Sequence, residues 1–249
     1  ANIIISGKNF SPSINANKIF MGGVKAAINS ASSTSISFSV PFGASYGPIS
    51  IQANGYTQNS RSVFTPVFPG KKGIDSTAFS SMISILSGVQ FGLIKTADID
   101  GDGKNDLIGL SANKDSMYVM LNSNTGSILA SHFQSKTSFL TGLQPTTLNI
   151  SDLDADGKLD VVVTSKLDSA IYVFRNTSST GSISFSSPLV IITGKYPVST
   201  SIGDIDGDGL LDVVTADSLD KTISIHRNAS VPGTLDTNSF QPRNTINVS

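Results

Sequence analysis

The string DIDGDGKND, residues 98–106, places four aspartates within nine residues, at positions 1, 3, 5 and 9 of the string. Two related strings follow, DLDADGKLD from Asp152 and DIDGDGLLD from Asp204, so the three starts lie 54 and 52 residues apart. A glycine precedes each string by ten residues, and a phenylalanine precedes each glycine by nine. Because the surroundings recur together with the aspartates, the sequence predicts a repeated structural unit and not an isolated loop.

Each Asp string is followed by two short apolar runs with a polar turn between them, such as VVVTS, KLDS and AIYVF in the middle repeat. Short runs rich in Val, Ile, Tyr and Phe between turns predict β-strands. Adding the strand before each string and one near each repeat phenylalanine gives four strands per unit, which is typical of a β-propeller blade. We therefore predict three blades within residues 75–249. The expected repeats are 79–132, 133–184 and 185–239, with the start of a fourth at Phe240.

The blade number raises the question of ring closure. Propellers usually have about four to eight blades, so three close a ring poorly. The chain also begins at Ala1 inside a strand-like run. We expect the ring to be completed by further propeller blades of a longer parent chain or by a homodimer.

Residues 1–66 do not carry the repeat. They contain short alternating segments such as SISFSVP, separated by Gly, Pro and Asn turns, which predicts a small β-sandwich. The prolines of TPVFPGKKG predict a linker over residues 67–74. All 18 acidic residues are Asp, which disfavours helices, and the absence of cysteine excludes disulfides and thiolate metal sites. The whole chain is expected to be all-β.

The first segment resembles an IPT/TIG domain, an immunoglobulin-like (Ig-like) sandwich. The matching elements are ISGKNFSP from Ile5, IFMGGVKA from Ile19, SISFSVP from Ser35 and GPISI from Gly47. Such domains usually have one more strand before the ISGKNF element. Because that strand is missing here, we expect a truncated sandwich or one with an open edge.

Residues 75–249 resemble FG-GAP/VCBS repeats, the calcium-binding blades of integrin-α-like propellers that also occur in secreted bacterial proteins. The Asp strings are the specific part of this resemblance. Ala155 replaces the first glycine in the middle string, and a clear GAP tripeptide is missing. Neither departure touches an expected ligand.

Carboxylates at positions 1, 3, 5 and 9 can surround a hard cation, with the carbonyl of position 7 and a water completing about six or seven oxygens. Glycine at position 6 permits the sharp turn, and four close carboxylates without a cation would repel one another. We therefore predict three calcium sites. The expected ligands are the carboxylates of Asp98, Asp100, Asp102, Asp106, Asp152, Asp154, Asp156, Asp160, Asp204, Asp206, Asp208 and Asp212, and the backbone carbonyls of Lys104, Lys158 and Leu210.

Other readings of these strings are weaker. An EF-hand needs a bidentate Glu at position 12 and flanking helices, whereas position 12 here is Gly109, Val163 or Thr215 between strand-like runs. Magnesium keeps its waters and rarely takes an all-protein cage. A catalytic acid pair needs two carboxylates in different environments, and three near-identical strings offer no such asymmetry.

Few other side chains are candidates for chemistry. His132 and His226, the only histidines, are expected to be surface or half-buried residues without a catalytic or metal-binding role. The pairs Arg175-Asn176 and Arg227-Asn228 are interpreted as strand-ending turns in preference to ligand contacts. No catalytic fingerprint was found, so an enzyme is not expected.

The resemblances imply a non-enzymatic extracellular calcium-binding module for adhesion or protein binding, part of a larger secreted or cell-surface protein of a bacterium. The alternative is a carbohydrate-binding accessory module of a polysaccharide-degrading enzyme, so the partner is an unidentified protein or glycan. The formal net charge is −1 and the lysines are scattered, which argues against nucleic acid. No run of apolar residues is long enough for membrane insertion.

Overall fold

The computed structural model describes residues 1–41, 44, 46–65, 81–85, 87–124 and 128–248. Within these ranges the regular elements are β-strands, apart from two single-turn 3-10 helices, η1 (Ile14–Ala16) and η2 (Ala130–His132). The all-β prediction is confirmed. The predicted linker and the first repeat phenylalanine, Phe79, lie outside the described residues. In the described part of the chain, no helix has the length and apolar character needed to cross a bilayer.

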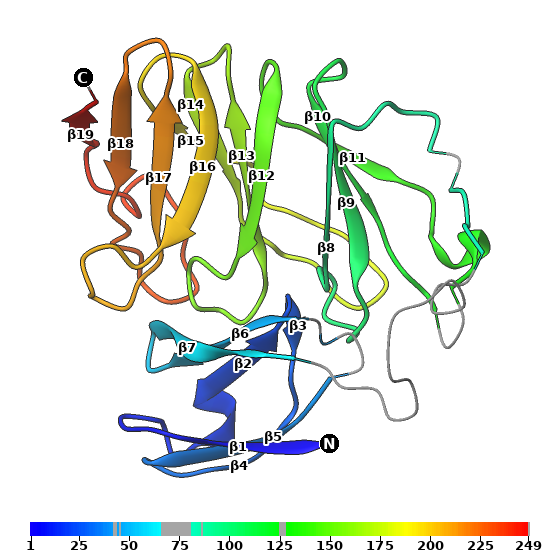
Figure 1. Cartoon of the computed structure of the whole chain (residues 1–249), viewed down its shortest axis with the longest axis vertical. Helices are drawn as coiled ribbons and strands as arrows, with labels where there is room; N and C mark the ends of the chain where they lie inside the picture. Colours follow the sequence, from blue (N-terminus) through cyan, green and yellow to red (C-terminus); the bar gives the residue numbers. More distant parts are fainter. Residues whose placement is uncertain (42–43, 45, 66–80, 86, 125–127, 249) are drawn as a thin grey trace.

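The N-terminal part is a sandwich of two sheets, drawn in blue and cyan in Figure 1, with strand orders β1-β5-β4 and β3-β2-β6-β7. Alternation along β5 buries Ile36 and Phe38 fully and leaves the three serines of the strand half-buried. Both side chains pack against Ile19 and Met21 of β2. The strands are β1 (Asn2–Ser6), β2 (Asn17–Met21), β3 (Val24–Lys25), β4 (Ile28–Ala31), β5 (Ser35–Ser39), β6 (Gly47–Ala53) and β7 (Tyr56–Phe64).

The edge strands β1 and β7 border a cleft of about 960 Å³. Its lining includes the apolar side chains of Ile5, Phe10, Ile51 and Phe64. The sandwich is therefore open between these two edges. That the sandwich lacks the usual first strand of such domains remains a prediction.

Three four-stranded antiparallel sheets follow, side by side above the sandwich in Figure 1. In each sheet every strand pairs with the next one along the chain. The first sheet contains β8 (Leu93–Ala97), β9 (Asp106–Ser111), β10 (Ser116–Met120) and β11 (Thr137–Leu140). The second contains β12 (Pro145–Ser151), β13 (Asp160–Ser165), β14 (Ala170–Phe174) and β15 (Leu189–Ile192). The third contains β16 (Pro197–Gly203), β17 (Asp212–Asp217), β18 (Thr222–His226) and β19 (Asn244–Asn247).

The sequence repeats and the sheets are out of phase by one strand. Each described repeat phenylalanine forms an isolated bridge with the asparagine after the third strand: Phe133 with Asn122, Phe185 with Asn176, and Phe240 with Asn228. The strand after that phenylalanine then pairs back onto the preceding sheet. Accordingly β19, which follows Phe240, completes the third sheet.

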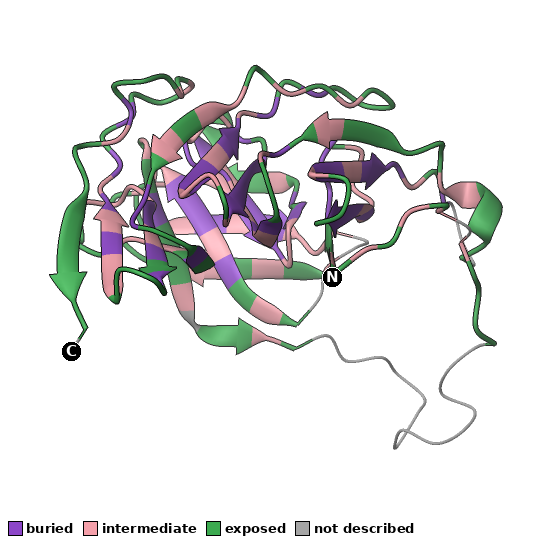
Figure 2. Ribbon diagram, turned by 90° about the horizontal axis from the view of Figure 1, so that it is seen from above, coloured by how far each residue is buried: buried purple, intermediate pink, exposed green. Residues whose placement is uncertain are grey.

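Two apolar cores lie between neighbouring sheets, where Figure 2 shows the buried strands. The first lies between the first and second sheets and includes Ile108 and Val161. The second lies between the second and third sheets and includes Val162 and Val213. Phe20 of the sandwich joins the first of these cores, so the N-terminal domain packs directly onto the sheets.

Candidate metal centres

The three Asp strings form loops that connect the first and second strands of each sheet. We call residues 98–106, 152–160 and 204–212 the first, second and third Asp loops. The position-9 aspartate begins the second strand, and its two oxygens accept backbone N–H bonds from both sides. Asp106 accepts from Ile99 and from Asn122, each at 2.9 Å, and Asp160 and Asp212 repeat both bonds at 2.8–2.9 Å. This aspartate therefore closes its loop and ties it to the third strand.

Positions 1, 3 and 9 come together in every loop. In each group, one carboxylate oxygen per residue lies within 4.8 Å of the others. Calcium binds oxygens at about 2.3–2.6 Å, so one ion can reach three oxygens that are this close together. The groups are Asp98, Asp100 and Asp106; Asp152, Asp154 and Asp160; and Asp204, Asp206 and Asp212.

One buried oxygen in the first Asp loop has no hydrogen-bond partner. Asp98 is 6% exposed, and its Oδ1 atom is unpaired in the described structure, whereas Oδ2 accepts the N–H of Gly103 at 3.0 Å. A buried oxygen without a partner is costly, and a cation is the partner that a carboxylate group favours most. The residues present therefore fit a hard divalent cation.

Burial shifts the titration of the loop carboxylates. It raises the pKa of Asp98 to about 6 and the pKa of Asp106 and Asp152 to about 7, with neighbouring aspartates adding to the rise. The pKa of Asp160 is also raised well above its ordinary value, again mainly by burial. Removal from water disfavours the charged form, and a bound cation would offset that cost.

The position-5 aspartates lie outside these groups of three. Asp102, Asp156 and Asp208 each accept the N–H of the position-7 residue, at 2.8–2.9 Å. Their second oxygens pair with a cationic side chain, which is Lys104 in the first loop. The ligand roles of Asp102, Asp156, Asp208 and of the carbonyls of Lys104, Lys158 and Leu210 stay predictions.

Arginines bridge two carboxylates in the second and third loops. Arg175 contacts Asp154 at 2.6 Å and Asp156 at 2.8 Å. Arg227 makes the same pair of contacts, with Asp206 and Asp208. Leu121 occupies the equivalent position in the first repeat. The sequence interpretation missed these ion pairs, although the recurring Arg-Asn pair was the signal that could have identified them.

The asparagines of these pairs do more than end a strand. The turn prediction is confirmed, because Oδ1 of Asn176 accepts the N–H of Ser178 at 2.8 Å. In addition, Nδ2 of Asn176 donates to the carbonyl of Ile99 in the preceding Asp loop at 2.8 Å. Asn228 repeats this bond with Leu153 at 2.9 Å. The second and third sheets therefore each hold the Asp loop of the sheet before them.

A second contact between neighbouring repeats covers the first two loops. The N–H of Gly181 donates to Oδ2 of Asp100 at 2.7 Å, and the N–H of Gly233 donates to the carbonyl of Asp154 at 2.6 Å. Asp100 and Asp154 are buried as a result, whereas Asp206 of the third loop is exposed. Coverage of a loop therefore depends on the sheet that follows it.

The N-terminal domain lies against all three Asp loops (Figure 1). In the first loop, the N–H of Asp98 donates to the carbonyl of Gly23 at 3.2 Å. In the second, Gln52 donates to the carbonyl of Asp152 at 3.2 Å, and Lys18 and Lys25 donate to further loop carbonyls. In the third, the N–H of Thr57 donates to the carbonyl of Gly209 at 2.6 Å. The loops therefore form part of the domain interface, which the sequence did not indicate.

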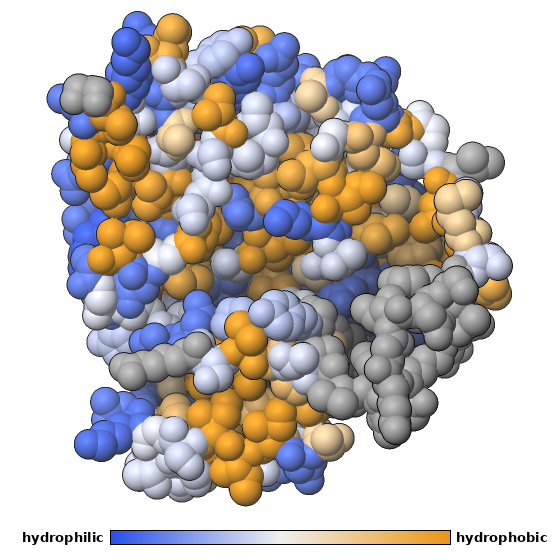
Figure 3. Space-filling view, in the orientation of Figure 1, coloured by the Kyte–Doolittle hydropathy of each residue, from blue (hydrophilic) through white to orange (hydrophobic). Residues whose placement is uncertain are grey.

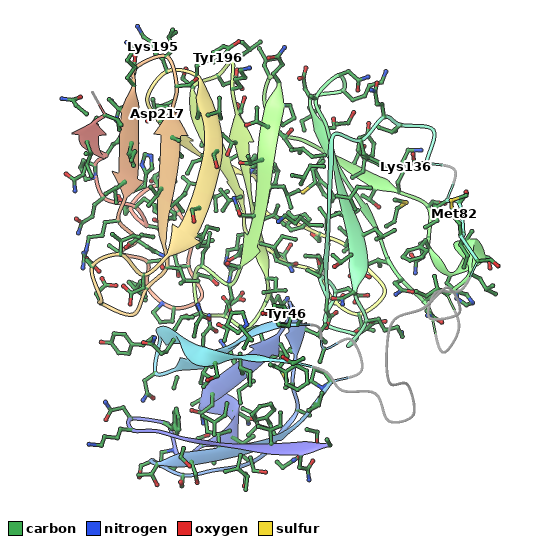
Figure 4. All side chains as sticks on the ribbon, in the orientation of Figure 1. Tyr46, Met82, Lys136, Lys195, Tyr196 and Asp217 are labelled. Atoms are coloured by element: carbon green, nitrogen blue, oxygen red, sulfur yellow. The ribbon has the colours of Figure 1, made fainter. Side chains whose placement is uncertain are left out.

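The opposite end of the third sheet carries a separate buried carboxylate. Figure 4 shows Asp217 near Lys195 and Tyr196 at the end of the sheet away from the N-terminal domain. Asp217 is 1% exposed and accepts bonds from the hydroxyls of Thr215, Thr222 and Ser224. These hydroxyls donate the hydrogen bonds that the buried carboxylate needs, so its burial is explained without a ligand.

The histidine prediction is right for one residue and wrong for the other. His132 is half-buried, and its Nδ1 atom accepts the N–H of Leu129 at 3.3 Å. His226 is 1% exposed, because β18 turns it into the interior beside the apolar side chains of Ile191 and Phe240. Burial lowers the pKa of His226 to about 4. His226 points into the interior because side chains alternate between the two faces of a strand, and the polarity of histidine does not prevent this.

The fold and the loops define an all-β repeat protein with an Ig-like domain and a series of Asp-loop sheets. The IPT/TIG domain family matches residues 1–66, and the FG-GAP-like repeat family matches residues 98–163 and 152–215. The chain therefore contains an IPT/TIG domain followed by FG-GAP-like repeats. No curated protein sequence matches the chain.

Three solved structures have distant similarity. A putative phosphatase from Bacteroides thetaiotaomicron VPI-5482 is 14% identical with a TM-score of 0.36; 91% of this chain matches 52% of it, so the chain spans about half its length. Auxiliary nutrient binding proteins from Bacteroides ovatus ATCC 8483 and Bacteroides thetaiotaomicron VPI-5482 are 11% and 12% identical, with TM-scores of 0.25 and 0.26. Both matches cover 98% of this chain and 82% of the other. At these TM-scores the similarity carries no argument about function.

Proposed function

We propose that the chain is a non-enzymatic, calcium-binding module of a secreted or cell-surface protein. The observation that carries the proposal is the repeated gathering of three carboxylates within 4.8 Å in each Asp loop. The buried Oδ1 atom of Asp98 supports it, because Asp98 belongs to the first group and this oxygen accepts no hydrogen bond in the described structure.

The carboxylates at positions 1, 3 and 9 of each loop would hold the ion, and calcium would supply positive charge to a site where burial penalises negative charge. The loop backbone orients these side chains through the bonds to the position-9 aspartate. Extracellular calcium sites bind at roughly 0.1–1 mM. At about 1 mM calcium, each site would then add about 1 kcal/mol to the free energy of unfolding by mass action.

The proposal is tested by thermal unfolding with EGTA and with added calcium. We expect calcium to raise the Tm by roughly 2–4 °C for each occupied site, with restoration after chelation. Isothermal titration calorimetry supplies the direct measurement of binding. Equal Tm values with and without calcium, together with no heat of binding, would overturn the proposal.

Variants assign the ion to individual loops. Asp98→Asn, Asp152→Asn and Asp204→Asn should each remove one binding event from the calorimetric titration. Asp220→Asn is the matched control, because Asp220 is an exposed carboxylate outside the loops that accepts one backbone bond from Lys195. If the control reduces calcium binding as much as the loop variants, the loops are not the binding sites.

The module is proposed to serve adhesion or protein binding. Support for a non-enzymatic role comes from the repetition of the same group of three carboxylates in every loop, an arrangement that suits one cation in each loop. The alternative is glycan recognition as an accessory to a polysaccharide-degrading enzyme. A glycan array separates the two: calcium-dependent binding to a sugar supports the alternative, and absence of binding favours a protein partner.

A further inference from the structure

The first and second sheets each pack one face against the sheet that follows, and we call this face, and its equivalent in the third sheet, the forward face. The register places equivalent residues on this face, because Ile108 pairs with Val119 in the first sheet as Val162 pairs with Val173 in the second. In both sheets the forward-face side chains are at most 2% exposed. They are Ile99, Ile108, Met117 and Val119 in the first sheet, and Leu153, Val162, Ile171 and Val173 in the second.

The third sheet repeats this apolar pattern without a cover. Val214 pairs with Ile225, and Ile223 pairs with Ile246, in the same register as the equivalent residues of the other sheets. Ile205, the equivalent of Ile99 and Leu153, is 56% exposed, and Ile246 is 51% exposed. Val214, Ile223 and Ile225 are only half-buried. Figure 3 shows apolar side chains gathered over the third sheet at the left of the molecule. A contiguous apolar face of this kind marks an interaction site.

The third sheet also presents a backbone acceptor that the other sheets use. The carbonyls of Ile99 and Leu153 accept the side-chain amide of an asparagine from the following sheet. The carbonyl of Ile205 holds the equivalent position in the third Asp loop. An occupant that offers apolar side chains and an asparagine amide therefore matches this face.

The first sheet offers such a surface at the other end of the series. Its rear face carries Ile94, which is 56% exposed, whereas the equivalent residue of the second sheet, Leu148, is 1% exposed. Leu107, also on this face, is half-buried, while its equivalent, Val161, is fully buried. Asn122 is the equivalent of Asn176, and its side-chain amide donates within its own sheet, to the carbonyl of Asn105 at 2.9 Å. The rear of the first sheet therefore resembles the surfaces that cover the first and second sheets.

We propose that the forward face of the third sheet binds the rear face of the first sheet in a second copy of this chain. The contact continues the two interfaces between sheets that already exist within the chain. Two copies related by a two-fold axis would make the contact twice and bring six sheets together, which is within the usual range of about four to eight for a closed propeller. The N-terminal domain lies at the Asp-loop ends of the sheets and leaves the forward face of the third sheet open (Figure 1).

Sedimentation velocity over a range of protein concentrations tests the proposal. We expect a dimer that dissociates on dilution, and we expect Ile205→Asp to weaken the dimer at least 100-fold while circular dichroism shows an unchanged fold. Ile192→Asp is the matched control, because Ile192 is 64% exposed at the edge strand of the second sheet and lies outside the proposed contact. This control should leave the dimer intact.

The reciprocal variant is Ile94→Asp, on the rear face of the first sheet. By itself this variant should also fail to form homodimers. In an equimolar mixture with Ile205→Asp, a mixed pair keeps one contact in which both faces are unchanged. The mixture should therefore form dimers again. A monomer at every concentration, or a dimer that survives Ile205→Asp, would overturn the proposal. A dimer that is lost equally with Ile192→Asp would place the interface elsewhere and would also overturn it.

Discussion

The first and third Asp loops differ in sequence at two of nine positions, yet their surroundings differ widely. Ile99 in the first loop is 2% exposed, and its equivalent in the third loop, Ile205, is 56% exposed. Asp100 is buried under Gly181 of the next repeat, whereas the equivalent Asp206 is exposed. The difference shows that a loop's own residues set its turn and its carboxylate positions, while the following sheet decides whether the loop is removed from water.

The largest effect is expected from truncating the covered isoleucine. Ile99→Ala should lower the free energy of unfolding by about 3 kcal/mol, because it leaves a cavity in the core between the first two sheets. Ile205→Ala should cost less than about 0.5 kcal/mol under dilute, monomeric conditions, because Ile205 is already 56% exposed. Urea denaturation of both variants measures the difference. Equal costs would mean that the third loop is covered in solution even in the monomer.

A pH dependence of similar size is expected from the third sheet, which buries His226 where the first and second sheets have Met120 and Phe174. Burial lowers the pKa of His226 from 6.5 to about 4, so the folded protein holds the neutral form. Below about pH 6.5 the His226 imidazole binds a proton in the unfolded chain but not in the folded chain. The contribution of His226 to the free energy of unfolding should therefore fall by roughly 3 kcal/mol as the pH decreases from 6.5 to 4, whereas the buried aspartates, whose pKa is raised, change stability in the opposite direction over this range.

Denaturation at a series of pH values, in EGTA, measures this effect. His226→Met serves as the matched variant, since it places the first sheet's residue in the third sheet. The variant should lose the component of pH dependence between pH 6.5 and 4. An identical pH profile for both proteins would show that folding does not lower the pKa of His226.

A smaller difference in the free energy of unfolding is expected between asparagines that bond to a neighbouring sheet and Asn122, which bonds only within its own sheet. Asn176→Ala removes the amide's bonds to the carbonyls of Leu159 and Ile99, within and between sheets, whereas Asn122→Ala removes one amide bond, to its own sheet. Both variants also lose the bond that the side-chain oxygen accepts from the N–H two residues further on. One additional hydrogen bond is worth about 1 kcal/mol, so Asn176→Ala should cost about 1 kcal/mol more. Chemical denaturation measures both. The opposite order would contradict the idea that each sheet holds the preceding loop.

The smallest effect is expected from the arginine that distinguishes the second and third loops from the first. Arg175→Leu places the residue of the first repeat in the second and leaves Asp154 and Asp156 without their ion pair. Without calcium the loss should be below about 1 kcal/mol, because the guanidinium is partly solvated. With calcium the loss should be smaller still, since the ion supplies the charge. Thermal melts with and without calcium test this, and an equal loss in both conditions would contradict it.

The repeat itself was predictable because both of its signals are local. The spacing of the Asp strings and the strand-length apolar runs predicted four-stranded sheets, and the structure confirms an all-β chain with such sheets. The sheet to which the strand after each repeat phenylalanine belongs was not predictable, since the strand after Phe133 pairs with β10 of the preceding sheet. Sequence recurrence gives the length of a unit but not which neighbour each strand pairs with.

The residues by themselves determined the carboxylate pattern of the loops, because a turn of nine residues with Asp at fixed positions forms hydrogen bonds within itself, such as those from Ile99 to Asp106 and from Gly103 to Asp98. Tertiary structure alone decided which loops are buried, where Lys18 and Gln52 of the N-terminal domain contact them, and that Ile205 remains exposed. The physical reason is that burial depends on surfaces brought from more than 50 residues away along the chain, as in the bond from Asn176 to Ile99, and such contacts leave no local pattern in the sequence.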